Sequence, residues 1–405
     1  MNIEWFIARR LLKGDAEKSV SVPIVKIAIG GIALGLCVML LSVFIIIGFK
    51  HEITWKLSGF TSHLNIVPYE TSDGAILRVD SLMARLKRMD GVKEVYGYIE
   101  KPAILKSKSE IHGVVLKGVD STYDQSFFQR NLKEGKMPDL STPKASEEIL
   151  ISAFVADYLN VSAGDKIIAH FVQEPPRARA FRVSGIYDTG FKEYDDVSVL
   201  ADRRHLAKLN GWEPGQLGGV AVELFDVERV NEYGDRVDDL LYDMNESCEV
   251  KTLGDIAPQI FDWLSLLNVN VWVILILLVT VAGFNMVSGL LILILDKTTL
   301  IGILKALGCK NISLRRLFLY ISAGLIVKGM IWGNLLAFLL AGIQYYFEVV
   351  KLDPVTYYMS TVPIYFNGWY ILFLNIGVIV VTLLMLVVPT MLISKINPIK
   401  SIRFE

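Results

Sequence analysis

The stretch IAIGGIALGLCVMLLSVFIIIGF, residues 27–49, decides the fold. It contains no charged residue and is flanked by Lys26 and Lys50. A helix of about 20 apolar residues is long enough to cross the hydrocarbon core of a bilayer. The polar arm before it is longer than that of a cleaved signal peptide, and no small-x-small cleavage site follows it. We therefore expect a permanent membrane span here.

The whole chain is more apolar than an ordinary soluble protein. Its 405 residues are 53% hydrophobic, and the mean hydropathy is +0.45, which indicates several membrane spans. Charged residues still make up 20% of the chain, so a large part must face water. Three further stretches have the length and apolar character of a span, at 263–295, 317–347 and 370–393.

The distribution of basic residues predicts the orientation, because Lys and Arg accumulate in cytoplasmic loops. The N-terminal arm, the segment 296–316 and the tail 394–405 together contain 13 basic and 5 acidic residues. The segment 50–262 contains 26 basic and 35 acidic residues. Both termini and the segment 296–316 are therefore expected in the cytoplasm, and the segment 50–262 outside it.

The outer segment has a mixed α/β pattern. Strand-like alternation and helical periodicity follow each other along it, and its first and last parts repeat a strand–helix–strand order. We expect two similar β-α-β pieces around a central insertion at about 112–222. The acidic pair Asp195 and Asp196 is more typical of a solvated turn than of a metal site.

Together these patterns predict an α-helical membrane protein with four transmembrane helices. A large α/β extracytoplasmic domain is inserted between the first and second helices. The expected parts are a cytoplasmic interfacial helix or simple charged anchor at 1–22, spans at 23–49, 263–295, 317–347 and 370–393, the outer head at 50–262, a short cytoplasmic helix at 296–316, a short outer loop at 348–369 and a cytoplasmic tail at 394–405.

Lys328 is the one charged residue inside the third expected span. A charge at that depth is costly and usually has a partner or a function. It indicates either an ion or substrate pathway or a clamp between helices, with Asn285, Asn334 and Asn375 as hydrogen-bonding candidates. We favour the clamp, because no acidic residue lies deep in any span to complete a proton relay.

The segment DKTTLIGILKALGCKNISLRR, residues 296–316, has more order than a simple connector needs. Helical spacing gives it one apolar face, formed by Leu300, Ile303, Leu304 and Leu307. Thr298 is expected to cap the start of the helix and Gly308 to end it. A helix this short needs a surface to lie on, and periodicity leaves the membrane and a protein groove equally open.

The chain has no motif for chemistry of its own. It contains no G-x-x-x-x-G-K-[ST], no H-E-x-x-H and no G-x-S-x-G. We expect no catalytic residue, no metal site and no cofactor, and any ATP must be bound and hydrolysed by another protein.

Several stretches resemble one family of permeases. IGILKALGCK, residues 301–310, is similar to the cytoplasmic coupling helix of the FtsX-like/MacB superfamily of ABC-transporter permeases. The glycine-studded first span with its exit GFKHEI, and VVLKGVD and YDTGFKEYD in the head, resemble permease subunits of the lipoprotein-releasing (Lol) system most closely. The resemblance covers the whole chain and rests on the order of the motifs.

The resemblance implies a mechanism and a cellular location. Two permease subunits, identical or different, pair in the bacterial inner membrane, each with a separate cytoplasmic ABC ATPase, and a MacB-like head lies in the periplasm. ATP-driven closure pushes on the coupling helices, and the motion passes along the spans to the head. The implied coupling residues are Leu300, Ile301, Ile303, Leu304, Lys305, Leu307 and Gly308.

In the lipoprotein-releasing branch, acyl chains of a lipoprotein enter between the membrane helices, and a soluble periplasmic chaperone receives the cargo. No nucleic acid is implied as a partner. The residues assigned to the substrate path or to helix packing are Gly31, Gly35, Val38, Gly48, Phe49 and Lys328. Apolar Leu41, Val43 and Ile46 are further candidates for contact with acyl chains.

Two features depart from the family pattern. Leu300 stands where coupling helices often carry an acidic residue, which favours an apolar contact with the ATPase. The connection QEPPRA, residues 173–178, is shorter than the chaperone-binding hairpin of one Lol branch.

Two other functions compete with lipoprotein release. One is an FtsX-like or MacB-like permease that transmits motion to a periplasmic partner or expels peptides or toxins. The other is a sensor or adhesion head without transport. The absent P-loop and the basic, periodic loop favour a subunit that needs an ATPase, and the long first span with its GFKHEI exit favours lipoproteins.

Overall fold

The computed structural model describes residues 3–13, 21–69, 75–76, 79–213 and 215–392. The chain divides into two compact units. The first, which we call the helical unit, comprises Met1–Lys50, Leu264–Val350 and Val362–Glu405. The second, which we call the head, comprises His51–Trp263 and Lys351–Thr361. The expected tail at 394–405 and part of the expected N-terminal helix lie outside the described residues.

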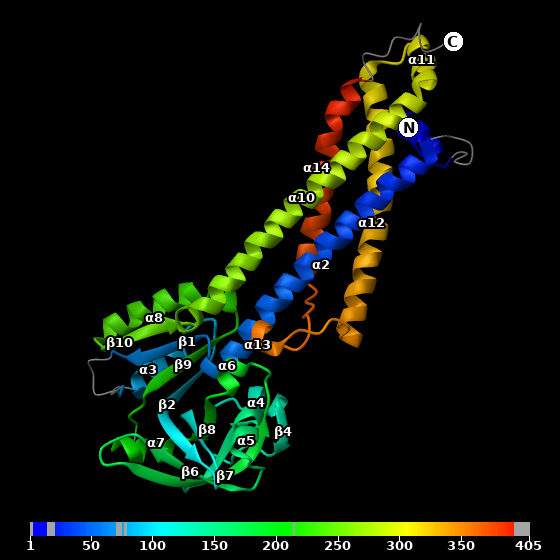
Figure 1. Cartoon of the computed structure of the whole chain (residues 1–405). Coiled ribbons are helices and arrows are strands. Elements are labelled where there is room, and N and C mark those ends of the chain that lie inside the picture. The colour runs from blue at the N-terminus through cyan, green and yellow to red at the C-terminus, as the bar shows by residue number, and fades with distance from the viewer. Residues whose placement is uncertain (1–2, 14–20, 70–74, 77–78, 214, 393–405) are drawn as a thin grey trace. The chain divides into compact units, whose positions relative to one another are not determined.

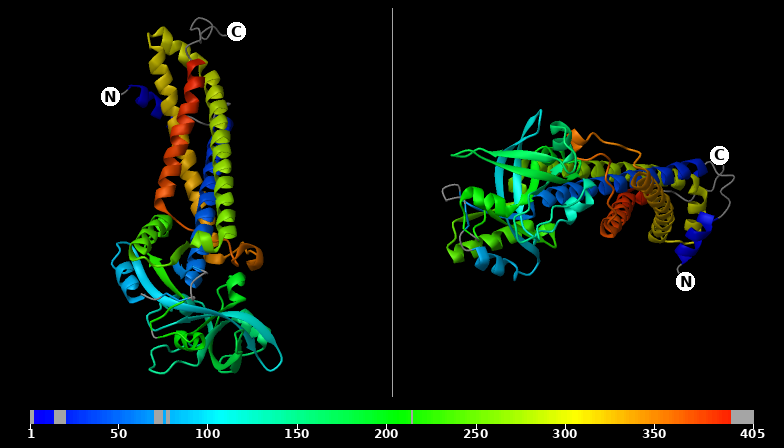
Figure 2. Two further views of the ribbon diagram at one scale, coloured as in Figure 1. Left: turned by 90° about the vertical axis from the view of Figure 1, so that its left-hand side faces the viewer. Right: turned by 90° about the horizontal axis from the view of Figure 1, so that it is seen from below.

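Long helices build the helical unit, as Figures 1 and 2 show. Four helices in the described part of the chain are long and apolar enough to cross a membrane. They and the two shorter helices are α1 (Ile3–Lys13), α2 (Ser21–Thr61), α10 (Pro258–Asp296), α11 (Thr298–Ala306), α12 (Asn311–Phe347) and α14 (Gly368–Met391). Each expected span falls largely within one of the four long helices. α1 and α14 both pack against α12.

A pair of glycines brings α12 close to α2. Gly329 and Gly333 form a G-x-x-x-G motif, which lets two helix backbones approach. A Cβ atom on Gly333 would lie 2.8 Å from the carbonyl oxygen of Ala33. One on Gly329 would lie 2.9 Å from Cβ of Ile32. The motif is visible in the sequence as GMIWG, residues 329–333, although neither glycine is among the residues expected for helix packing.

A pair of asparagines joins α12 to α14. Asn334 Nδ2 donates to Asn375 Oδ1 at 2.8 Å, and Asn375 Nδ2 donates back to Asn334 Oδ1 at 3.1 Å. The same two amides also donate to the carbonyls of Met330 and Ile371, at 2.8 Å each. Polar side chains in apolar surroundings are stable when they satisfy each other in this way.

The first part of the head is an antiparallel sheet built from two interleaved β-α-β pieces (Figure 1). The pieces are β1 (Leu64–Pro68), α3 (Val79–Leu86) and β2 (Val92–Lys106), then β9 (Gly219–Leu224), α8 (Val230–Met244) and β10 (Cys248–Thr252). The strand order is β10-β1-β9-β2, and each neighbouring pair is antiparallel. The two pieces thus share one sheet, the split β-α-β arrangement of ferredoxin-like domains.

The second part of the head is a closed barrel. Strand pairing runs β2-β3-β8-β5-β7-β6 and returns to β2. The added strands are β3 (Ile111–Val119), β5 (Glu148–Ser152), β6 (Lys166–Phe171), β7 (Arg177–Tyr187) and β8 (Ser198–Asp202), and β4 (Leu132–Gly135) pairs with β7. Alternate residues such as Leu105, Leu116 and Phe171 are buried inside it.

Short helices and turns complete the head. They are α4 (Ser126–Arg130), α5 (Ala153–Leu159), α6 (Lys192–Asp195), α7 (Arg203–Asn210), a 3₁₀ turn at Val227–Arg229, α9 (Leu253–Ile256) and α13 (Pro354–Tyr357). The end expected for the central insertion, residue 222, falls inside β9, a strand of the first sheet that pairs with β1 and β2.

Candidate functional site

The short helix expected between the second and third spans is present as α11. Its N-cap is Lys297, whose carbonyl accepts the N–H of Ile301 at 2.9 Å. The expected cap by Thr298 is wrong, because its hydroxyl donates backwards to the carbonyl of Leu295 at 2.9 Å. α11 therefore follows α10 almost without interruption, and the hydroxyl helps to close the turn between them.

Gly308 ends α11 as expected. Its φ of +87° is in the left-handed region that favours glycine. The N–H of Gly308 donates to the carbonyl of Lys305 at 3.0 Å, and that of Cys309 to the carbonyl of Leu304 at 2.9 Å. This double closure fixes the end of the helix and the direction of the chain after it.

The apolar residues of α11 divide between two sides of the helix. Ile301 is fully buried in the core of the helical unit, and half-buried Leu304 packs against the same core. Ile303 and Leu307 are 44% and 79% exposed. Leu300 and Lys305 are half-buried. The single apolar face expected from spacing is therefore wrong.

The exposed side of α11 forms a small surface of its own. Ile303 and Leu307 are one turn apart, and the exposed residues Thr299 and Ala306 lie on the same side. We call these four residues the α11 patch. Because Ile301 anchors the opposite side, the patch is free to bind a partner without unpacking the helix.

Glycines of the first span pack against α10 and the chain before α14. A Cβ atom on Gly31 would lie 3.0 Å from Nδ2 of Asn285, and one on Gly35 would lie 3.8 Å from Cβ of Ala282. One on Gly48 would lie 2.5 Å from the carbonyl oxygen of Pro363. Phe49 beside it is buried. The glycines expected to allow close approach therefore face neighbouring backbone or side chains.

One side of α2 in the helical unit is open. Ile27, Leu34 and Val38 are 72%, 65% and 38% exposed and follow each other at spacings of seven and four residues. We call these three residues the α2 stripe. The acyl contacts expected of Val43 and Ile46 do not fit the structure, because both side chains are buried, at 6% and 8% exposure.

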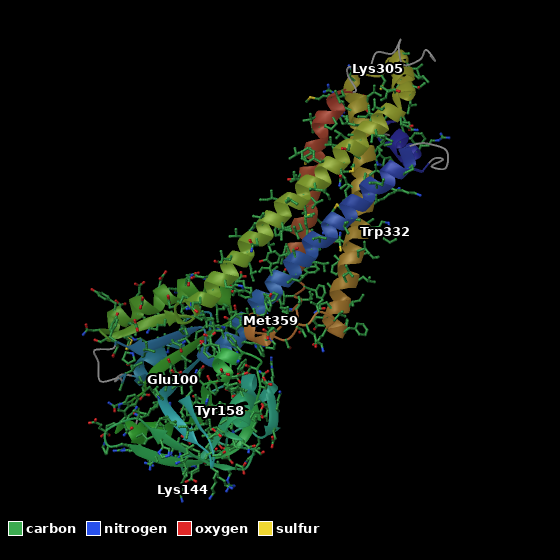
Figure 3. All side chains as sticks on the ribbon, viewed as in Figure 1. Glu100, Lys144, Tyr158, Lys305, Trp332 and Met359 are labelled. Atoms are coloured by element: carbon green, nitrogen blue, oxygen red, sulfur yellow. The ribbon has the colours of Figure 1, made fainter. Side chains whose placement is uncertain are left out.

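Lys328 does not form the expected clamp. Its side chain is exposed, and among the described residues it has no hydrogen bond or ion pair. Asn334 and Asn375 satisfy each other instead. Trp332, one turn further along α12, is 58% exposed (Figure 3). Lys328 and Trp332 thus lie on a surface of the chain, away from its own helix contacts.

Replacing Lys328 with methionine is expected to leave the free energy of unfolding of the purified chain unchanged within about 0.5 kcal/mol. The matched variant Asn334→Leu leaves Oδ1 of Asn375 without its donor, which costs about 1–3 kcal/mol. The measurement is unfolding of both variants in the same detergent. If Lys328→Met lowered the free energy of unfolding as much as Asn334→Leu does, the result would support the clamp between helices.

The end of α2 is fixed in the head by an aromatic cluster. The ring of Phe60 lies with its centroid 5.1–6.4 Å from five other rings, those of Phe127, Phe128, Tyr187, Phe191 and Tyr194. Three of these rings come from YDTGFKEYD, residues 187–195, one of the stretches that resemble Lol permeases. Large buried rings are major contributors to packing energy.

A buried lysine caps the same helix end. Lys117 Nζ donates to the carbonyl of Phe60, and the rings of Tyr98 and Tyr96 lie 5.0 and 5.8 Å from it. Burial lowers the pKa of Lys117. A cation at the C-terminus of a helix complements the helix dipole, and the ring faces partly replace water. Sequence reasoning gave no sign of this contact, because Lys117 comes from a strand far along the chain.

Asp195 is buried rather than part of a solvated turn, so that expectation is wrong. Its carboxylate accepts the hydroxyl of Thr189 at 2.8 Å and the N–H of the same residue at 3.2 Å. Burial raises the pKa of Asp195 to about 6. Within the described residues, no group of three or more His, Cys, Asp or Glu side chains is placed to hold a metal ion.

Four apolar helices of spanning length and a separate α/β unit define a membrane protein with a folded domain. Residues 27–240 match the family model of the MacB-like periplasmic core domain, and residues 272–398 match that of the FtsX-like permease C-terminal region. The chain therefore belongs to the FtsX-like permeases that carry a MacB-like periplasmic core domain.

Several relatives match nearly the whole chain. The lipoprotein-releasing system transmembrane protein LolC of Xylella fastidiosa is 24% identical and covers 93% of this chain and 92% of its own length. The protein LolE of the same system in Haemophilus influenzae is 22% identical and covers 98% of both chains. Among solved structures, the periplasmic region of MacB from Actinobacillus actinomycetemcomitans covers 50% of this chain and 95% of its own at 15% identity, with a TM-score of 0.35.

Proposed function

We propose that this chain is a permease subunit of an ABC transporter that releases lipoproteins from the bacterial inner membrane towards a periplasmic chaperone. The observation that carries the proposal is the match to LolC and LolE, which extends over both the head and the helical unit. The chain has no P-loop, so a separate cytoplasmic ATPase supplies the energy.

The proposed topology follows from the basic residues. Both termini and α11 lie in the cytoplasm, α2, α10, α12 and α14 span the membrane, and the head lies in the periplasm. The excess of basic residues in 296–316 supports this orientation. A second permease subunit, identical or different, completes the membrane part.

The α11 patch is proposed to dock the ATPase. Ile303 and Leu307 offer apolar side chains to a groove on the partner, while buried Ile301 carries the push into the helical unit. Leu300 is half-buried and therefore contributes less to the contact than its place in the motif implies. Gly308 fixes the end of the helix. A displacement of the α11 patch is therefore passed on to α12 through a defined turn.

The α2 stripe is proposed to meet the acyl chains or the second subunit. Its three apolar residues face away from the core of their own unit, as a surface in contact with lipid-like chains requires. Val38 is the one residue of the expected path that lies on this stripe. Gly31, Gly35 and Gly48 act through packing instead, because their open sides are filled by neighbours.

Depletion of this chain in its native host is expected to leave lipoproteins destined for the outer membrane in the inner membrane. The measurement is membrane fractionation followed by detection of a marker lipoprotein. Expression of the intact chain should restore the normal distribution. A normal distribution in depleted cells would contradict the proposal.

The MacB-like family model of the head supports a second candidate, a permease that expels peptides or toxins or transmits motion to a periplasmic partner. In that case, depletion leaves lipoproteins correctly placed and changes sensitivity to exported compounds or the integrity of the cell wall. The same fractionation experiment separates the two candidates.

A further inference from the structure

The connection between α12 and α14 contains a segment that belongs to the head. Residues Lys351–Thr361 group with the head rather than with the helices on either side. The segment closes on itself, because the N–H of Leu352 donates to the carbonyl of Ser360 at 2.8 Å. Inside it, α13 is held by the carboxylate of Asp353, which accepts the hydroxyl of Thr356 at 2.8 Å. It is therefore an ordered loop.

Tyr358 is the centre of the contact that this loop makes. Its ring centroid lies 5.3 Å from that of Phe191 and 6.2 Å from that of Trp263, with both pairs close to edge-on. Its carbonyl accepts a hydrogen bond from Nζ of Lys56 at 3.3 Å. Met359 next to it is 3% exposed (Figure 3). We call these five residues the Tyr358 joint.

The joint contains a residue from every element by which the chain passes between its two units. Lys56 lies on α2, Trp263 on α10, and Tyr358 on the connection from α12 to α14. The chain crosses between units at 50–51, 263–264, 350–351 and 361–362. Phe191 comes from the head and also packs on Phe60, so the joint continues into the aromatic cluster at the end of α2.

We propose that the Tyr358 joint ties the three connections together, so that movement of α12 and α14 reaches the head in step with movement of α2 and α10. Close-packed side chains transmit displacement because they leave little space for independent adjustment. Without the Tyr358 ring, the connection between α12 and α14 loses its aromatic contacts with Phe191 and Trp263. This inference rests on the proposed function, in which ATP-driven motion must reach the head.

Tyr358 acts here as a positioning residue, and its neighbour provides a matched control. Tyr357 is 39% exposed, so Tyr357→Ala removes a ring of the same size from outside the joint. Tyr358→Phe keeps the ring and the backbone carbonyl that accepts from Lys56. Only Tyr358→Ala should open the joint.

The test uses the full chain with the ATPase that co-purifies with it, reconstituted in vesicles that contain a fluorescent triacylated lipoprotein. ATP hydrolysis and lipoprotein release are measured together. Tyr358→Ala is expected to lower the lipoprotein released per ATP by about fivefold, with hydrolysis retained. Tyr357→Ala and Tyr358→Phe should behave like the unmodified chain. An unchanged ratio in Tyr358→Ala, or equal loss of hydrolysis and release, would overturn the inference.

A labelling experiment reports on the joint without transport. In a Cys309→Ser background, a Met359→Cys side chain is buried and should react slowly with a maleimide. Adding Tyr358→Ala should increase the labelling rate, and adding Tyr357→Ala should not. Equal labelling rates with and without Tyr358→Ala would contradict the proposed role of the Tyr358 joint, even if lipoprotein release falls. If the unmodified vesicles release no lipoprotein, the proposed function fails, while the labelling rates still decide whether the joint exists.

Discussion

Replacing Leu307 with aspartate is expected to abolish binding of the ATPase. Leu307 is the most exposed apolar side chain of the α11 segment, at 79%, and has little contact with its own unit. A carboxylate in an apolar groove loses its hydration without gaining a partner. We expect affinity to fall about 100-fold, which corresponds to about 2.7 kcal/mol. The measurement is co-purification of the ATPase with the full chain.

The control for this experiment is Leu307→Met, which keeps an apolar side chain of similar volume and should retain the ATPase. Leu304→Asp is less informative, because Leu304 packs against the core of the helical unit and its loss would also disturb folding. Normal co-purification by Leu307→Asp would show that the ATPase docks elsewhere than on the α11 patch.

Replacing Gly333 with alanine is expected to destabilise the helical unit by about 1–3 kcal/mol. The added Cβ would stand 2.8 Å from the carbonyl oxygen of Ala33, and a backbone atom on a packed helix cannot move aside cheaply. α12 and α2 would have to separate along the G-x-x-x-G contact. The measurement is the unfolding free energy in detergent.

Gly342→Ala is the matched control on the same helix. A Cβ atom there meets no atom within 4 Å. Alanine also has a higher helix propensity than glycine, so this variant should be neutral or up to about 1 kcal/mol more stable. Equal destabilisation by both variants would show that the G-x-x-x-G contact does not hold α12 against α2.

The spans were predictable because a bilayer imposes a length that few soluble segments reach. The longer strands of the head and the helices α3, α5 and α8 were also predictable, because their residues follow a strand or a helix period. The closed barrel was not predictable, because its closure depends on β2 pairing with β6, and no local pattern encodes a pairing over so many residues.

The site was less predictable than the fold. α11 is apolar on two sides, so spacing alone selected a stripe that mixes the core residue Leu304 with the exposed residues Ile303 and Leu307. The clamp was favoured for Lys328 because no acidic residue lies deep in a span, but two of the candidate asparagines satisfy each other. The G-x-x-x-G motif could have been found by reading α12 for paired small residues.

The most direct test of the proposed function is release of a lipoprotein from reconstituted vesicles. The vesicles contain this chain, its partner permease if one co-purifies, the ATPase and a fluorescent triacylated lipoprotein, with a soluble lipoprotein-binding chaperone outside. Adding ATP should transfer the lipoprotein to the soluble fraction, and the Leu307→Asp chain should not support transfer. ATP hydrolysis by the complete assembly with the lipoprotein left in the vesicles would contradict the proposal.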